Sequence, residues 1–214
     1  MSTLLTSHRI FFLSIILSSA CSVYSGVVSD VNSTIDFPHD QAYINTNQPT
    51  IIGTLRDENG NPVINETVQI LIDGAAVGTT TSDDNGIYRL LLDPGLADGQ
   101  YELSVFCVES EAIIESNYFT IDTTVPSIDI TYPQEGDVVT DTIITIAGTT
   151  EANAMVITFL DDDAFGSICY ADQYGNWSIE YEVNNGNHTI AAQSTNIAGN
   201  QSYLSETVQF AVNA

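Results

Sequence analysis

The sequence repeats a set of landmarks at nearly constant spacing, which indicates two versions of one structural unit. The landmark pairs are Gly53-Thr54 with Gly148-Thr149, 84–88 with 173–177, and 99–103 with 186–190. The spacing between partners falls from 95 to 87 residues, so the first unit carries slightly longer loops. Self-similarity of this kind indicates a duplicated fold before any strand is assigned. The stretch 121–126 is the joint between the two units.

Short runs between the landmarks alternate apolar and polar residues with period two. Three runs recur in both units: 68–72 with 156–160, 88–92 with 177–181, and 101–107 with 188–194. In the first of them, Val68, Ile70 and Ile72 are expected to face inward. The runs are separated by turns rich in Asp, Asn and Gly, which favour chain reversal. This pattern predicts an all-β chain with two tandem Ig-like β-sandwich domains.

We place the first domain at 36–124 and the second at 125–214. Phe37-Pro38 and Tyr132-Pro133, again 95 residues apart, mark the expected entry into an edge strand of each domain. Proline costs no ladder hydrogen bond at such an edge. Residues 26–35 are small and polar without periodicity, and we expect a spacer there.

The first 25 residues carry the pattern of an export signal. Arg9 supplies a positive charge, an apolar run covers 10–17, and Ser18-Ser19-Ala20 offers a cleavage site. The apolar run is too short to span a bilayer, which takes about 20 residues. Cys21 follows directly and allows an alternative, a lipoprotein signal with Cys21 as lipid acceptor, although Ser18 stands where such signals usually carry Leu. We expect a secreted or cell-envelope protein, with lipid anchoring as the open alternative.

The charge of the chain excludes several classes of partner. Its 28 acidic residues face three arginines and no lysine, for a formal net charge of −25. Such a field repels nucleic acid and anionic membranes and attracts cations. Hydrophobic residues make up 43% of the chain, enough to build cores rather than a disordered tail. Cys107 and Cys169 fall at non-equivalent places in different units, so we expect buried thiols and no inter-sheet disulfide.

The landmarks resemble those of bacterial Ig-like domains, the modules strung in tandem along large surface adhesins and biofilm proteins. The resemblance rests on 50–54, 72–74, 78–81, 84–88, 96–101 and 121–126 in the first unit, and on 148–149, 174–177 and 198–200 in the second. It implies a structural or binding module at the cell surface. The first unit departs from the family at 109–114, where an Asp and a Gly-Asn pair are usual. Segments 55–63 and 81–86 also resemble transthyretin-like domains, which are sandwiches too.

No arrangement of residues predicts catalysis. His39 and His188 are the only histidines after the expected signal, and they fall in different units. Phosphate-binding loops, metal-spaced Cys/His clusters and nucleophile elbows are absent from the sequence. We predict a non-catalytic, exported, adhesin-like module with a protein or glycan ligand and no nucleic-acid partner. The alternative is a carbohydrate-binding or accessory lipoprotein module, with Tyr170, Tyr174 and Tyr203 as a platform that stacks against sugars.

Acidic residues near the joint form a candidate calcium site. Calcium takes six to eight oxygen ligands, and extracellular modules bind it at about 10⁻⁴ to 10⁻³ M. The resemblance implies ions of this kind at junctions between neighbouring domains; here Asp122 lies in the joint and Asp98 on a preceding loop. The run Asp161, Asp162 and Asp163 and the pair Asp83-Asp84 are alternative clusters. The other interpretation is a solvated acidic surface, which 28 acids would produce by chance.

Overall fold

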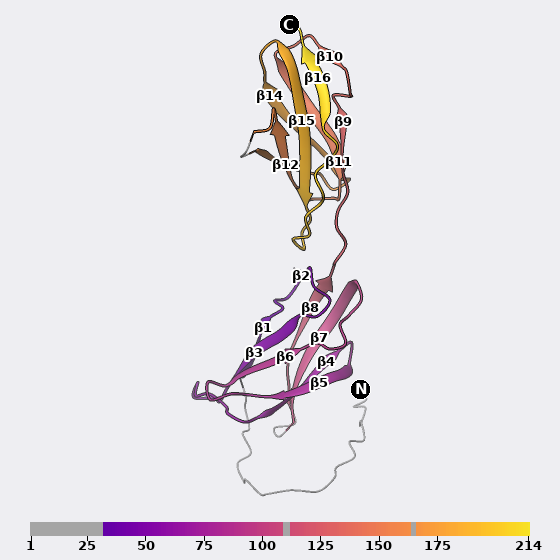
Figure 1. Ribbon diagram of the computed structural model, residues 1–214. Helices are drawn as coiled ribbons and strands as arrows, with labels where there is room; N and C mark the ends of the chain where they lie inside the picture. The colour runs from indigo at the N-terminus through magenta and orange to yellow at the C-terminus, as the bar shows by residue number, and fades with distance from the viewer. Residues whose placement is uncertain (1–31, 109–111, 164–165) are drawn as a thin grey trace, which may run out of the picture.

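The structure, a computed structural model, describes residues 32–108, 112–163 and 166–214. Within these ranges the chain forms sixteen β-strands and no helix, arranged as two sandwiches that follow one another along the chain (Figure 1). The predicted all-β tandem of Ig-like sandwiches is therefore confirmed. The expected export signal, Cys21, and residues 26–31 of the expected spacer lie outside the described residues.

The first sandwich contains eight strands in two sheets. They are β1 (Asn32–Phe37), β2 (Ala42–Ile44), β3 (Thr50–Arg56), β4 (Thr67–Ile72), β5 (Ala75–Thr81), β6 (Ile87–Leu91), β7 (Gly99–Cys107) and β8 (Ala112–Ile121). One sheet has the order β1-β3-β6, and the other has the order β2-β8-β7-β4-β5.

The second sandwich repeats this plan strand for strand. Its strands are β9 (Ile128–Tyr132), β10 (Val138–Val139), β11 (Ile143–Thr150), β12 (Met155–Leu160), β13 (Ser167–Tyr170), β14 (Asn176–Glu182), β15 (Gly186–Thr195) and β16 (Val208–Val212). The sheets have the orders β14-β11-β9 and β10-β16-β15-β12-β13. In both sandwiches a short strand, β2 or β10, runs parallel to the last strand, β8 or β16. The repeated landmarks in the sequence thus mark equivalent places in two copies of one topology.

The first strand of each sandwich ends, rather than begins, at the aromatic-proline pair. Strand β1 ends at Phe37 and β9 at Tyr132, and the following proline starts the crossing to the opposite sheet. The expectation that these pairs open the strands is wrong, because a residue without an N–H suits the point where the chain leaves a ladder. Strand β1 also begins at Asn32, since 32–35 pair with β3, so this part of the expected spacer is strand.

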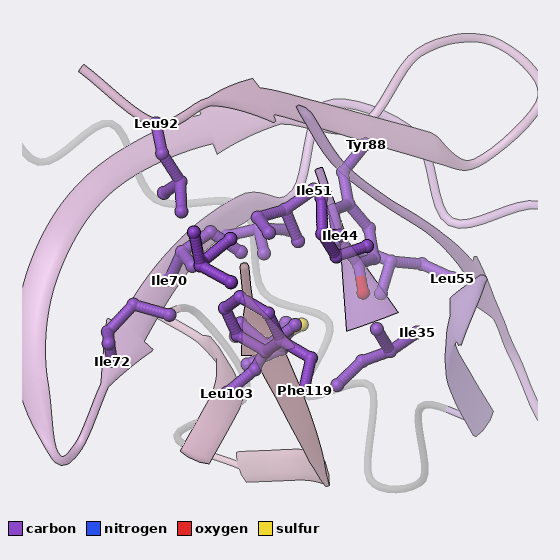
Figure 2. Close-up of a cluster of buried hydrophobic side chains, with 14 residues drawn as sticks. Ile35, Ile44, Ile51, Leu55, Ile70, Ile72, Tyr88, Leu92, Leu103 and Phe119 are labelled. Atoms are coloured by element: carbon purple, nitrogen blue, oxygen red, sulfur yellow. The ribbon is translucent and has the colours of Figure 1, made fainter. Parts of the chain in front are cut away.

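Each sandwich has its own hydrophobic core between its two sheets. The alternation on β4 is as predicted: Val68, Ile70 and Ile72 are buried and the residues between them are half-buried. Figure 2 shows the first core, where Phe119 and Ile70 lie among side chains from both sheets. Each fully buried side chain of this size contributes about 1.5–3 kcal/mol. The second core gathers around Trp177 in the same way.

A glycine facing an aromatic side chain explains the most regular landmark. Gly53 pairs with Tyr88 across β3 and β6, and Gly148 pairs with Trp177 across β11 and β14. A methyl group on Gly53 would overlap the Tyr88 hydroxyl, and one on Gly148 would overlap the Trp177 ring. The aromatic ring lies over the glycine in both sandwiches, so the pair is retained in both copies. Cys107 is buried in the first sandwich and Cys169 is half-buried in the second, and neither is in a disulfide among the described residues.

Candidate cation site between the two sandwiches

The segment 122–127 joins β8 to β9, and Asp122 bonds to both sandwiches. Its N–H donates to the carbonyl of Ile44 at 2.9 Å, which ties it to the first sandwich. Its Oδ2 accepts a hydrogen bond of 2.8 Å from Nδ2 of Asn196, and its carbonyl accepts one of 2.7 Å from Nδ2 of Asn200. Both asparagines belong to the loop between β15 and β16, which lies at the end of the second sandwich that faces the first (Figure 1). Through these hydrogen bonds Asp122 connects this loop to the end of the first sandwich.

Asn196 is surrounded by more acceptors than it can satisfy. Besides Asp122, its Nδ2 lies 3.2 Å from Oε2 of Glu151 and 3.3 Å from the carbonyl of Thr124. A side-chain amide carries two N–H donors, so three oxygens compete for two hydrogens. The Asn196 side chain is held in place because its Oδ1 accepts the N–H of Asn200 at 2.9 Å, and the residue is buried.

This arrangement is rich in oxygen and poor in positive charge. Two carboxylates, Asp122 and Glu151, lie within hydrogen-bonding reach of the same nitrogen, and neither is in a salt bridge among the described residues. The Asn196 amide and, for Asp122, the N–H of Thr124 at 3.0 Å from Oδ1 are the donors that offset the repulsion between these carboxylates. Carboxylate and carbonyl oxygens are the ligands that calcium prefers. Calcium binding at the junction stays a prediction, because the described residues contain no group of three or more Asp, Glu, His or Cys that could hold a metal ion.

Asp98 lies at the same linker, as expected, but its oxygens are engaged by donors. Oδ1 accepts hydrogen bonds from the N–H and the hydroxyl of Thr123, at 3.1 and 2.8 Å, and Oδ2 accepts one of 3.0 Å from the hydroxyl of Thr124. The hydroxyl of Thr123, followed by its N–H, lowers the pKa of Asp98. Asp98 thus fixes the path of the linker, and its part in calcium binding stays a prediction.

The run Asp161, Asp162 and Asp163 lies at the other end of the second sandwich, in the turn after β12. Oδ1 of Asp161 accepts the N–H of Thr189 at 2.9 Å, and its Oδ2 lies 2.7 Å from Nδ1 of His188. Asp161 and Asp162 have positive φ, of 51° and 60°, as in a tight turn. The junction residues and this run are therefore separate candidates.

His188 is a packing residue, as expected from its strand position, with polar partners that the sequence does not reveal. Its ring stacks at 5.6 Å from Phe210, and its side chain is 12% exposed. Nε2 lies 2.8 Å from the carbonyl of Asn184. Because both ring nitrogens face acceptors, the doubly protonated ring satisfies both contacts. The hydrogen bond to Asp161 accordingly raises the pKa of His188.

Three further aspartates are used within turns. Asp57, Asp83 and Asp172 each accept two backbone N–H groups, two and four residues further along the chain. These bonds, and for Asp57 first of all the side chain of Asn61, lower the pKa of each carboxyl group. Asp83 also lies 3.5 Å from Arg89. The alternative cluster Asp83-Asp84 thus contains one carboxylate that already stabilises a turn.

Sequence reasoning missed three of the four residues that meet at Asp122. Asp122 was a candidate, but Glu151, Asn196 and Asn200 were not. Asn200 does fall in the repeated landmark 198–200, so the sequence contained one signal. Asn196 and Glu151 are 74 and 29 residues from Asp122, and only the folded chain brings the three together.

In each sandwich the chain first adds one strand to the three-stranded sheet, β1 or β9, and then a short strand to the five-stranded sheet, β2 or β10. Two sandwiches built in this way define a tandem of Ig-like or fibronectin-III-like modules. No family model matches the sequence, and no curated protein matches it either. No helix in the described residues is long and apolar enough to cross a membrane.

Solved structures support the fold. The fibronectin(III)-like modules of Clostridium thermocellum CbhA match with a TM-score of 0.54 at 18% identity, over 85% of this chain and 94% of that one. A tetra-tandem repeat from the extending region of a large adhesion protein matches with a TM-score of 0.34 at 18% identity, over 85% of this chain and 49% of that one. The Yersinia pseudotuberculosis adhesin InvE matches with a TM-score of 0.34 at 15% identity, over 89% and 62%. Of these similarities, the one to the CbhA modules supports the fold, and none of them describes an activity.

Proposed function

We propose that the chain is an exported, non-catalytic spacer module of the adhesin type, whose two sandwiches are held in line at the cell surface by their junction. The observation that carries the proposal is the bonding of Asp122, whose N–H donates to Ile44 of the first sandwich, with Asn196 and Asn200 of the second. A flexible tether needs no such contacts, because a linker without partners leaves neighbouring domains free to reorient. A junction with several hydrogen bonds transmits position from one module to the next.

Calcium is the ligand that this junction suits best. Asp122, Glu151 and the carbonyl of Thr124 would hold the ion once the Nδ2 group of Asn196, which lies among these three oxygens, turns away, and water would complete the shell. Bound calcium would supply positive charge between two carboxylates that now share one amide donor. With the weak affinity typical of extracellular modules, about 0.5 mM, a 10 mM concentration of the ion would stabilise the folded junction by about 1.8 kcal/mol.

Thermal unfolding of the full chain tests the calcium part of the proposal. The unfolding midpoint should be several degrees higher in 10 mM Ca²⁺ than in chelator. The variants Asp122→Ala and Glu151→Gln should each lose most of this increase. Asp129→Asn removes an exposed carboxylate on β9 and should keep it. Identical melting curves with and without the ion would end the calcium proposal and leave the spacer role standing.

Surface display is tested separately on intact cells that produce the protein. An antibody raised against the chain should label these cells without lysis. Labelling that requires lysis would contradict the surface location. Incorporation of a labelled fatty acid into the wild type but not into Cys21→Ser would identify Cys21 as the lipid acceptor, and equal incorporation would remove it.

A second candidate function is carbohydrate binding by exposed tyrosines. Tyr174 and Tyr203 are 79% and 88% exposed, and Tyr170 is 69% exposed. Large aromatic rings with this much exposure are suited to stacking on the apolar faces of sugars. A glycan array with the wild type and Tyr174→Ala separates the two candidates. Equal glycan binding by both proteins would exclude Tyr174 from a sugar platform.

A further inference from the structure

One sheet of this acidic protein lacks Asp, Glu, Lys and Arg, and its one histidine, His188, is 12% exposed and packs against Phe210. The strands β10, β16, β15, β12 and β13 contain no Asp, Glu, Lys or Arg. The chain as a whole has 28 acids, and the opposite sheet of the same sandwich contains Asp129, Glu180 and Glu182. The outer face of the five-stranded sheet is therefore a neutral area on a molecule of net charge −25.

The part of this outer face formed by β12 and β13 is also apolar. Val156 and Thr158 point into the core, so Met155, Ile157 and Phe159 of β12 point outward. On the neighbouring edge strand, Tyr170 pairs with Met155 and Ile168 pairs with Ile157. Ile168 is 58% exposed and Tyr170 is 69% exposed. We call the outward side chains of Met155, Ile157, Phe159, Ile168 and Tyr170 the neutral face.

The first sandwich provides a matched comparison for the neutral face. Because Val68 corresponds to Val156, the outward residues of β4 and β5 can be aligned with those of β12 and β13. The equivalent pairs are Thr67 with Met155, Gln69 with Ile157, Leu71 with Phe159, Thr79 with Ile168, and Thr81 with Tyr170. Four of the five positions are polar in the first sandwich and apolar in the second. A sandwich of this topology thus folds without the apolar side chains, so folding does not require them.

We infer that the neutral face is an interaction surface for a second copy of this chain, packed face to face about a two-fold axis. Two molecules of charge −25 repel one another, and the repulsion is smallest where neither presents a carboxylate. A cationic partner would be attracted to the acidic surfaces instead. Aliphatic side chains, methionine and tyrosine are typical of protein interfaces, and a two-fold dimer brings identical patches together.

The size of the face predicts a weak dimer. The contact is limited by the outer face of the whole sheet, of which the neutral face is the β12–β13 part: five strands about 4.8 Å apart, with about five residues each at 3.3 Å per residue, cover about 400 Å². Two copies would bury about 800 Å² in total, below the 1,200–2,000 Å² typical of stable complexes. We therefore expect a dissociation constant on the order of 10⁻⁴ M. Such a dimer forms where molecules are concentrated, for example on a cell surface.

Sedimentation equilibrium of the full chain from 10 µM to 1 mM tests the inference. The measurement is made with reductant and chelator, so that neither a disulfide through Cys169 nor a bridging ion joins two copies. The double variant Ile168→Thr/Tyr170→Thr installs the residues found at the equivalent positions of the first sandwich and should weaken dimerisation at least tenfold. The matched control Thr79→Ala/Thr81→Ala should dimerise as the wild type does. A wild type that stays monomeric at 1 mM overturns the inference.

Salt gives an independent readout. Because the neutral face is apolar and the rest of each copy is acidic, screening should strengthen the dimer as NaCl rises from 50 to 500 mM. A dimer that weakens over this range would depend on attraction between charges and would rule out the neutral face. If the double variant and the Thr79→Ala/Thr81→Ala control weaken the dimer equally, the neutral face is also ruled out as the dimer contact. Unchanged melting temperatures verify that each variant is folded.

Discussion

Replacing Asn196 by aspartate tests the junction most directly, because the two side chains have the same shape. The change removes the Nδ2 donor shared by Asp122, Glu151 and the Thr124 carbonyl. It keeps an oxygen that can accept the N–H of Asn200. In the absence of calcium, three acceptors lose their donor and a third carboxylate joins two others.

The expected loss of stability follows from these contacts. Each lost hydrogen bond costs about 0.5–1.5 kcal/mol, and water replaces part of it because Glu151 is exposed. Each like-charge contact at about 4 Å costs about 1 kcal/mol in water-like surroundings. The sum is about 3 kcal/mol for Asn196→Asp. For a domain of about 90 residues this lowers the unfolding midpoint of the second sandwich by about 10 to 20 °C.

Calcium should offset part of this loss of stability. Asn196→Asp provides a third carboxylate for the ion, so the gain in midpoint between chelator and 10 mM Ca²⁺ should be larger than for the wild type. Scanning calorimetry of the full chain in both buffers measures the gain. Asn213→Asp adds the same charge at an exposed position near the end of the chain and serves as the control. If both variants melt alike in chelator, the reasoning about the junction is refuted.

Three further predictions concern the fold. Gly148→Ala should destabilise the second sandwich by about 1–3 kcal/mol, since the new methyl group would overlap the Trp177 ring and the Asp129 carbonyl. Gly53→Ala should destabilise only the first sandwich, and a variant that lowers both calorimetric transitions would contradict separate cores. His188 has a raised pKa, so its contribution to the free energy of unfolding is fully present below the ordinary value of 6.5 and is lost as the pH rises through the folded pKa. The stability difference between wild type and His188→Gln should therefore be larger at pH 5.5 than at pH 9, and a pH-independent difference would exclude the Asp161 contact. Asp172 has a lowered pKa, so its contribution to the free energy of unfolding is present above the ordinary value of 3.8 and is lost as the pH falls through the folded pKa. Asp172→Asn should therefore remove part of the acid sensitivity below pH 3.8, and an unaltered acid-unfolding curve would show that the turn does not depend on this carboxylate.

The fold was predictable because its determinants are local or repeated. The alternation of Val68, Ile70 and Ile72 identifies the core face of a strand from residues two apart. The turn at Asp172 is visible as an Asp four residues before Asn176, since the carboxylate bonds to N–H groups inside the same turn. The role of Pro38 was misjudged because a proline beside a strand looks the same in sequence whether it precedes or follows the strand.

The sequence by itself determined that two similar all-β units follow one another, because period-two patterns, turn residues and a duplicated glycine are properties of short segments. Only the tertiary structure decided which of the acidic residues meet at the junction. Asp122, Glu151 and Asn196 come from three distant segments, and their oxygens converge because loops of both sandwiches end at the same junction. The neutral face likewise exists only once β12 and β13 pair, because the register of the strands decides which side chains lie together on the outside.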